Sequence, residues 1–157
     1  MVKLNRTTEY ALISIRHMVM KLEKNDSSMT SAREISDRYQ LPFEITAKTL
    51  QRMRDTGIIQ SEQGARGGYL LKRKPEDFSL AEFLELMEGP QSVVGCTNPS
   101  TASCACEYQV HCDMQGMMKG LNDRIRSFLA DIRLSEFANS RVGLTITTQK
   151  AEEAKAV

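Results

Sequence analysis

The sequence predicts a mainly α-helical fold with one small β-hairpin, and three observations support this prediction. Apolar residues recur every three or four positions through the first 55 residues, as they do in amphipathic helices. Two short apolar runs then flank a glycine-rich turn within residues 58–71, the pattern of a hairpin. A second helical repeat of apolar residues extends from Met114 to Ile132.

The first helix is expected to begin at Thr7 and Thr8, because threonine side chains can cap a helix start and Glu9 then falls in the first turn. The helix ends near the polar run at residues 25–28. Its apolar positions have the spacing of one helix face, namely Ala11, Leu12, Ile15, Val19 and Leu22.

Two shorter helices follow. One begins near Ser31 and stops before Pro42, because proline disfavours helical geometry in the residue that precedes it. The next spans residues 43–55 and ends at Gly57, a typical residue after a helix C-terminus. Its inward positions are expected to be Ile45 or Ala47, Leu50 and Met53.

The hairpin comes next, with strands around residues 58–61 and 69–71 and the turn Gly64-Ala65-Arg66-Gly67-Gly68 between them. Helix, helix-turn-helix and hairpin in this order predict a winged helix-turn-helix domain. A nucleotide-binding glycine loop is disfavoured, since the turn lies between strands and lacks the Gly-Lys-Ser/Thr ending.

The second half adds a helix that opens at Ser79 and closes at Gly89-Pro90, a cysteine-rich loop, and a long helix. In the long helix the apolar residues form an a/d stripe, Met114, Met118, Leu121, Ile125, Phe128 and Ile132. We expect this helix to form a homodimer. The predicted organisation is a DNA-binding domain at 1–78, a connecting helix and cysteine-rich cluster-binding loop at 79–113, a dimerisation helix at 114–138 and a flexible tail at 139–157.

Charge is distributed unevenly along the chain. Residues 1–75 contain 14 Lys and Arg against 8 Asp and Glu, whereas residues 76–157 contain 7 against 12. The basic first half is therefore the candidate surface for a polyanion such as DNA. No apolar run reaches the roughly 20 residues needed to span a bilayer, and the start does not resemble a signal peptide, so we expect a cytoplasmic protein without membrane contact.

The charged surface suggests specific DNA contacts. On the third helix the candidates are Thr46, Lys48, Thr49 and Arg52, since Leu50 and Met53 must face inward and the second helix of the motif enters the major groove. Arg66 at the wing tip suits a narrow minor groove. Further side chains are expected to contact phosphates, and these are Arg54, Lys72, Arg73 and Lys74.

All four cysteines, Cys96, Cys104, Cys106 and Cys112, fall within seventeen residues. Disulfides are rare in the cytoplasm, so these residues are interpreted as metal ligands or redox-active thiols. Structural zinc prefers paired Cys-x2-4-Cys knuckles, which are absent, and Cys104 and Cys106 could form a redox dithiol. Iron-sulfur clusters accept irregular spacings. The spacing alone leaves all three alternatives open.

Five segments in a fixed order give the sequence a family resemblance. They are TTEYAL, AKTLQRMRDTGII, GARGGYLL, SLAEFLELMEGP and the late cysteine loop followed by a long helix. In this order they resemble the Rrf2 family of winged-helix transcription regulators, which includes iron-sulfur sensors, over about residues 1–138. The resemblance implies a homodimeric DNA-binding regulator that senses nitric oxide, redox state or iron-sulfur status through a 2Fe-2S or 4Fe-4S cluster.

The resemblance also implies a ligand set. Cys96, Cys106 and Cys112 match the three cysteines of the family's cluster loop, and Cys104 is extra. The fourth ligand in some members is an acidic residue just before the tyrosine of the first helix, contributed by the other subunit, and here that position is Glu9. In others it is a histidine shortly after the third cysteine, whereas His111 here precedes Cys112. Glu9, Cys104 and His111 are therefore the three candidates for the fourth ligand.

Two other functions are weighed against the cluster sensor. One is a cluster-free or zinc-containing DNA-binding regulator with a Cys104/Cys106 thiol switch. The other is an iron-sulfur carrier, which leaves the helix-turn-helix and the wing without a purpose. Catalysis is not expected, because no Ser/His/Asp set, paired-carboxylate motif or nucleotide loop is evident.

Overall fold

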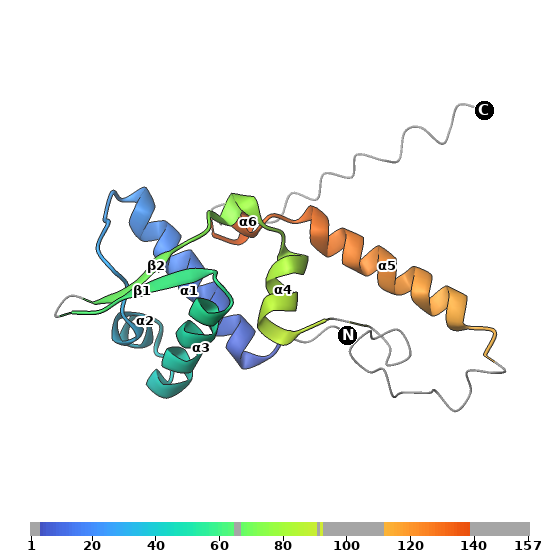
Figure 1. Cartoon of the computed structure of the whole chain (residues 1–157), viewed down its shortest axis with the longest axis horizontal. Coiled ribbons are helices and arrows are strands. Elements are labelled where there is room, and N and C mark those ends of the chain that lie inside the picture. Colours follow the sequence, from blue (N-terminus) through green and yellow to red (C-terminus); the bar gives the residue numbers. More distant parts are fainter. Residues whose placement is uncertain (1–3, 65–66, 91, 93–111, 139–157) are drawn as a thin grey trace.

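The computed structural model describes residues 4–64, 67–90, 92 and 112–138 of the 157-residue chain. Helices make up most of it, and the hairpin projects to the left of them in Figure 1, whereas α5 projects to the right. The described helices include none that is long and apolar enough to cross a membrane. The elements in chain order are α1 (Arg6–Glu23), α2 (Ala32–Tyr39), α3 (Phe43–Asp55), β1 (Ile59–Glu62), β2 (Gly68–Leu71), η1 (Pro75–Asp77), α4 (Leu80–Glu88), α5 (Gln115–Asp131) and α6 (Leu134–Ala138).

The start of α1 differs from the prediction in its capping residue. Asn5 is the N-cap, and its side-chain oxygen accepts hydrogen bonds from the Thr8 backbone N–H at 2.8 Å and the Thr8 hydroxyl at 3.0 Å. Asparagine is among the strongest N-cap residues, and it precedes Thr7 and Thr8 in the chain. Thr8 is therefore a buried residue of the first turn, not the cap.

The helix-turn-helix unit of α2 and α3 is confirmed, and its ends are set by local signals. The Ser31 hydroxyl caps α2 by accepting from the Glu34 N–H at 3.0 Å. After α3, Gly57 has a φ of +76°, and the Ile58 N–H donates to the Met53 carbonyl at 3.0 Å. This is a Schellman ending, which glycine favours because the left-handed conformation carries no Cβ penalty there.

The predicted hairpin is also confirmed, with β1 and β2 antiparallel and Ile59 opposite Leu71. Thr30 adds an isolated bridge to Tyr69 on the outer side of β2. A Cβ at Gly68 would lie 2.9 Å from the Met29 Cβ, so glycine allows this close approach of the chain before α2. The wing is thereby attached directly to the helix-turn-helix.

One hydrophobic core joins elements from both halves of the chain. Its fully buried members include Ile15 of α1, Leu50 of α3 and Phe83 of α4. Leu134 of α6 belongs to the same cluster and is 0% exposed. The core therefore continues past residue 78, where the sequence suggested that the DNA-binding domain ends.

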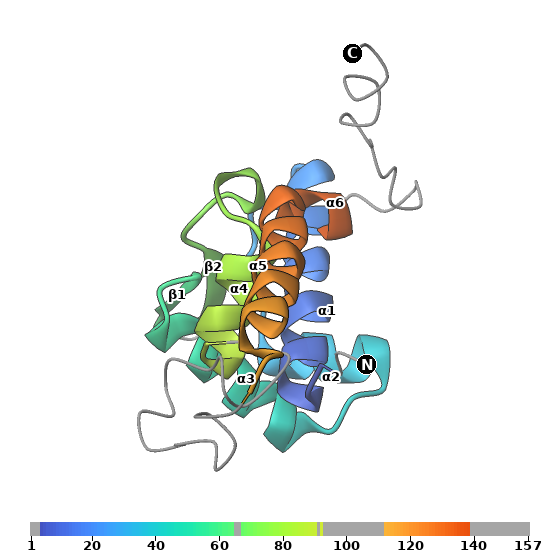
Figure 2. The same ribbon diagram turned by 90° about the vertical axis from the view of Figure 1, so that its right-hand side faces the viewer.

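The long helix predicted to lie within residues 114–138 is in fact two helices. α5 ends at Asp131, the backbone of Ile132 is extended, and α6 begins at Leu134. The Leu80 N–H donates to the Ile132 carbonyl at 2.8 Å, and the Leu134 N–H donates to the Phe78 carbonyl at 3.2 Å. The chain thus returns from α5, which contacts α4 and slants away from it in Figure 1, to place α6 against α1 and η1. Figure 2 shows the same elements with α5 toward the viewer. The break between α5 and α6 lets Leu134 enter the hydrophobic core, and burial of this side chain favours it.

Candidate nucleic-acid interface and cysteine segment

The outward face of α3 differs from the predicted one. Thr46 and Thr49 were expected to face a DNA groove, but both are 0% exposed. The Thr46 hydroxyl donates to the Pro42 carbonyl at 2.9 Å and the Thr49 hydroxyl to the Ile45 carbonyl at 2.8 Å, so each hydroxyl is satisfied within its own helix. Because α3 packs against both α1 and α2, its buried face is wider than the predicted apolar stripe. Neither threonine is available to a base in this structure.

Lys48 and Arg52 stand on the exposed face of α3 as predicted, one helical turn apart. Neither forms an ion pair with another residue in the described part of the chain. The other exposed side chains between Glu44 and Arg52 are Glu44, Ile45 and Gln51. The exposed face thus combines two free cations with polar groups and one apolar side chain.

The predicted phosphate contacts separate into two groups. Lys72 and Lys74 are exposed. The guanidinium of Arg73 instead donates to Glu82 at 2.7 Å and stacks over the Phe78 ring at 4.7 Å. Arg73 therefore ties the end of the wing to α4.

Arg54 differs again, because it donates through Nε and Nη2 to Oδ1 of its neighbour Asp55, at 3.0 and 2.8 Å. At the wing tip, Arg66 lies outside the described residues. The turn is closed by the Gly67 N–H, which donates to the Gly64 carbonyl at 2.9 Å. The predicted minor-groove contact of Arg66 remains a prediction.

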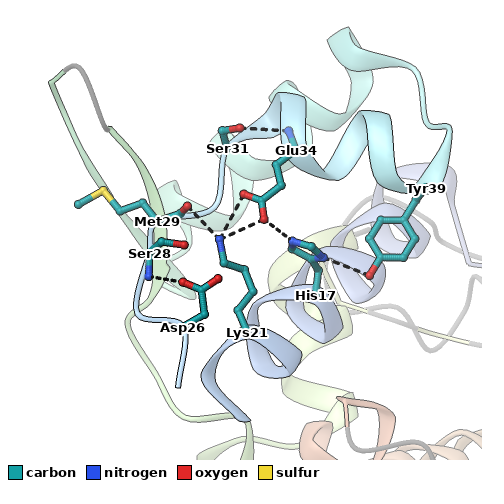
Figure 3. Close-up of polar contacts among 8 residues, drawn as sticks. All are labelled: His17, Lys21, Asp26, Ser28, Met29, Ser31, Glu34 and Tyr39. Carbon is teal, nitrogen blue, oxygen red and sulfur yellow. Dashed lines mark hydrogen bonds and ion pairs between the residues drawn. The ribbon is translucent and has the colours of Figure 1, made fainter. Parts of the chain in front are cut away.

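A polar cluster that the sequence did not indicate joins α1 to α2 (Figure 3). The Glu34 carboxylate accepts from His17 Nε2 at 2.9 Å and from Lys21 Nζ at 3.0 Å. His17 Nδ1 lies 3.2 Å from the Tyr39 hydroxyl, and Lys21 Nζ also donates to the Met29 carbonyl. The neutral Nε2–H tautomer of His17 satisfies both of its contacts, since the tyrosine hydroxyl then donates to Nδ1. The cluster holds α2, and with it α3, at a defined position on α1.

Glu34 gives this cluster a pH dependence. Burial raises the pKa of Glu34, but the hydrogen bonds from His17 and Lys21 outweigh it, so the net pKa is below the ordinary value of 4.5. A lowered folded-state pKa contributes stability that is present above pH 4.5 and is lost as the pH falls through the folded value.

We expect Glu34→Gln to lower the free energy of unfolding by about 1–3 kcal/mol at neutral pH, because it leaves the buried Lys21 ammonium without its carboxylate. The difference from wild type should shrink as the pH falls below 4.5 and through the lower folded-state pKa of Glu34. Urea unfolding at pH 7 and in acid measures both effects, with the exposed Asp37→Asn as the control. A difference that does not change with pH would contradict this role of the carboxylate.

The described part of the cysteine segment is its end. Cys112 is half-buried just before α5 and is a free thiol. Glu9 is exposed in the first turn of α1. The other predicted ligands lie outside the described residues, namely Cys96, Cys104, Cys106 and His111. Within the described ranges no three His, Cys, Asp or Glu residues are grouped as metal ligands.

The end of α4 is attached to the start of α1. The Glu88 carboxylate accepts from the backbone N–H of Asn5 at 3.0 Å, and Asn5 is the cap of the helix that carries Glu9. One turn earlier in α4, Glu85 pairs with Arg126 of α5 at 2.7 Å. α4 thus connects the start of α1 with α5, and the cysteine segment joins the ends of α4 and α5 along the chain.

Comparison with known proteins identifies the family. The Rrf2 family of iron-dependent transcriptional regulators matches residues 4–140. The chain belongs to this family. The Rrf2 membership confirms the sequence resemblance and makes the protein a winged-helix transcription regulator, not an enzyme.

Individual Rrf2 relatives are distant but nearly full length. The HTH-type transcriptional regulator IscR of Cronobacter sakazakii is 22% identical over 149 residues, which cover 95% of this chain and 90% of that protein. A putative HTH-type transcriptional regulator of Haemophilus influenzae is 25% identical over 139 residues, 88% of each chain.

Among solved structures, CymR of B. subtilis, described as its global cysteine regulator, has a TM-score of 0.65 at 21% identity and covers 88% of this chain and 97% of its own. T. potens IscR has a TM-score of 0.61 at 18% identity, covering 86% and 85%. These similarities confirm the predicted fold class, a mainly helical winged helix with a two-stranded wing.

Proposed function

We propose that this Rrf2 regulator is a homodimer whose affinity for a DNA operator is controlled by an iron-sulfur cluster. The observation that carries the DNA-binding part is the exposed face of α3, where neither Lys48 nor Arg52 forms an ion pair with another described residue. The second helix of a helix-turn-helix enters the major groove, and free cations there neutralise phosphates or donate to guanine. Arg66 is proposed to contact the minor groove from the wing.

The dimer is proposed from the two sides of α5. Its half-buried row consists of Met118, Asn122, Ile125, Leu129 and, directly after the helix, Ile132, and the last two pack against the core. The neighbouring row is exposed and consists of Met114, Met117, Leu121 and Phe128. Four large apolar side chains in line on one helix favour association with the same row of a second copy. The predicted a/d stripe is thus divided between the fold and the proposed interface.

The cluster is proposed to be held by Cys96, Cys106 and Cys112, with Glu9, Cys104 or His111 as the fourth ligand. The described member of this set supports the proposal, because Cys112 is a free, half-buried thiol and thiolates are the usual ligands of iron-sulfur clusters. When bound, such a cluster supplies a centre that changes with redox state, nitric oxide and iron supply. The first turns of α1 and α5 stand well apart in one subunit (Figure 1), which favours a Glu9 contributed by the partner subunit.

A cluster held in this way would connect the DNA-binding domain to α5 of the partner. Its loss would release the start of α1, and the polar contacts of His17 and Lys21 with Glu34 join the second half of the same helix to the helix-turn-helix. Control of DNA binding requires that holo and apo proteins differ in operator affinity, typically by about 1–3 kcal/mol.

Oxygen-free purification tests the proposal. We expect protein with a brown or red colour that contains iron and acid-labile sulfide, and operator affinities that differ between holo, nitrosylated and apo forms. Glu9→Ala should alter the absorption spectrum or shorten the cluster lifetime, whereas Glu23→Ala, at the exposed end of the same helix, should not. An unchanged spectrum and lifetime would remove Glu9 from the ligand set.

Other outcomes distinguish the alternatives. Purified protein that contains stoichiometric zinc but no iron or sulfide would support a zinc site in place of the cluster. Iron-free protein whose DNA affinity follows the oxidation state of Cys104 and Cys106 would support a thiol switch. Equal DNA affinity in all forms would reject sensing while leaving DNA binding intact.

A further inference from the structure

We propose that Ile45 reads the C5 methyl group of a thymine in the major groove and is a specificity-determining residue of this regulator. The inference rests on the proposed insertion of α3 into DNA. The apolar pattern predicts that Ile45 or Ala47 is buried, whereas Ile45 is exposed in the structure.

Ile45 is a large apolar side chain that is exposed on the surface of the subunit. It is 41% exposed, although the residues that follow it, Thr46 and Thr49, are completely buried. The nearby Phe43 is similarly exposed at 43%, but the Arg33 guanidinium lies over its ring at 4.7 Å from the centroid. Phe43 therefore has a partner within the subunit. Ile45, in contrast, belongs neither to the hydrophobic core nor to the partly buried residues that pack against it.

Ile45 occupies a position from which a recognition helix can contact a base edge. The first turns of a recognition helix contact bases, and Ile45 lies in the first turn of α3. Lys48 and Arg52 follow at three and seven residues, so all three stand on one face of the helix. The two cations favour a polyanion on this face. Ile45 lies between them and the start of the helix, so its side chain needs an apolar group on that polyanion.

Only one such contact exists on base edges in the major groove, since the thymine methyl is the apolar group there. Isoleucine is suited to it, because its β-branched side chain has few rotamers and loses little freedom when it is covered. The Ile45 backbone is also held, as its carbonyl accepts the Thr49 hydroxyl at 2.8 Å. Removing one buried methyl group should weaken binding about fourfold.

The experiment uses the full-length dimer and duplexes selected from a randomised pool. In the selected duplex, each thymine is replaced in turn by deoxyuridine, which lacks only the C5 methyl group. We expect that replacing one particular thymine in each half-site lowers the affinity of the duplex for the wild-type protein about fourfold. Ile45→Ala should bind the thymine duplex more weakly and should no longer distinguish thymine from uracil at that position.

Leu22→Ala is the matched control, because Leu22 is also an exposed aliphatic side chain, at 54%, but stands at the end of α1. It should retain the wild-type discrimination. Wild-type protein that is insensitive to uracil at every position, or Ile45→Ala protein with unchanged discrimination, would overturn the inference. If no duplex is enriched at all, the proposed DNA-binding function itself fails, and this inference fails with it.

Discussion

Leu134→Ala is expected to lower the free energy of unfolding by about 2–5 kcal/mol, the range for truncating a buried leucine. Leu134 is 0% exposed, and its backbone N–H donates to the Phe78 carbonyl at 3.2 Å. The substitution leaves a cavity where α6 meets α1 and η1, because the surrounding side chains relax only partly. Urea unfolding monitored by circular dichroism measures the loss.

Leu121→Ala provides the matched comparison, since it removes the same atoms from a leucine that is 42% exposed on α5. At protein concentrations where the chain is monomeric, its unfolding free energy should change far less than that of Leu134→Ala. Equal effects of the two substitutions would show that α6 is not part of the core in solution.

Phe128→Asp should convert the proposed dimer to monomers and weaken operator binding about a hundredfold or more. Phe128 is 50% exposed and is the last residue of the outer row of α5, which consists of the exposed residues Met114, Met117, Leu121 and Phe128. The subunit can therefore accept a carboxylate at this position and still fold. A dimer holds its second DNA-binding domain at high effective concentration over the second half-site, and a monomer loses this gain. Sedimentation and DNA titrations at one fixed salt concentration measure the two effects.

Ala130→Asp is the control, because Ala130 is exposed on α5 outside this row and the change adds the same charge close to the same helix end. It should leave the dimer and its DNA affinity intact. A Phe128→Asp protein that remains dimeric and binds DNA normally would show that the outer row of α5 is not the interface.

The helices and the wing could be predicted from the sequence because their signals are local. Ser31 and Ser79 cap α2 and α4 as ordinary N-cap residues do, and Gly57 ends α3 by adopting a positive φ. Gly68 was expected in the wing and permits the close approach of Met29. The cap of α1 lies earlier in the chain than predicted, because Asn5 is a stronger N-cap than threonine.

The candidate site was less accessible to prediction, because exposure depends on neighbours that are distant in the sequence. Thr46 and Thr49 have the polarity of surface residues, but a threonine hydroxyl can bond the carbonyl four residues earlier and then be buried. Likewise His17 carried no signal by itself, since its partner Glu34 lies on another helix. Such contacts follow from packing, not from spacing.

The order of the elements and their approximate ends follow from the sequence, since helix caps, apolar periods and turn glycines act within a few residues. The packing of the helices sets which side chains of α3 face outward, how the apolar stripe of α5 divides into half-buried and exposed positions, and that Leu134 returns to the core. The physical reason is that a helical period sets only the relative directions of side chains along one helix. Which of those directions is buried depends on the surfaces that pack against it.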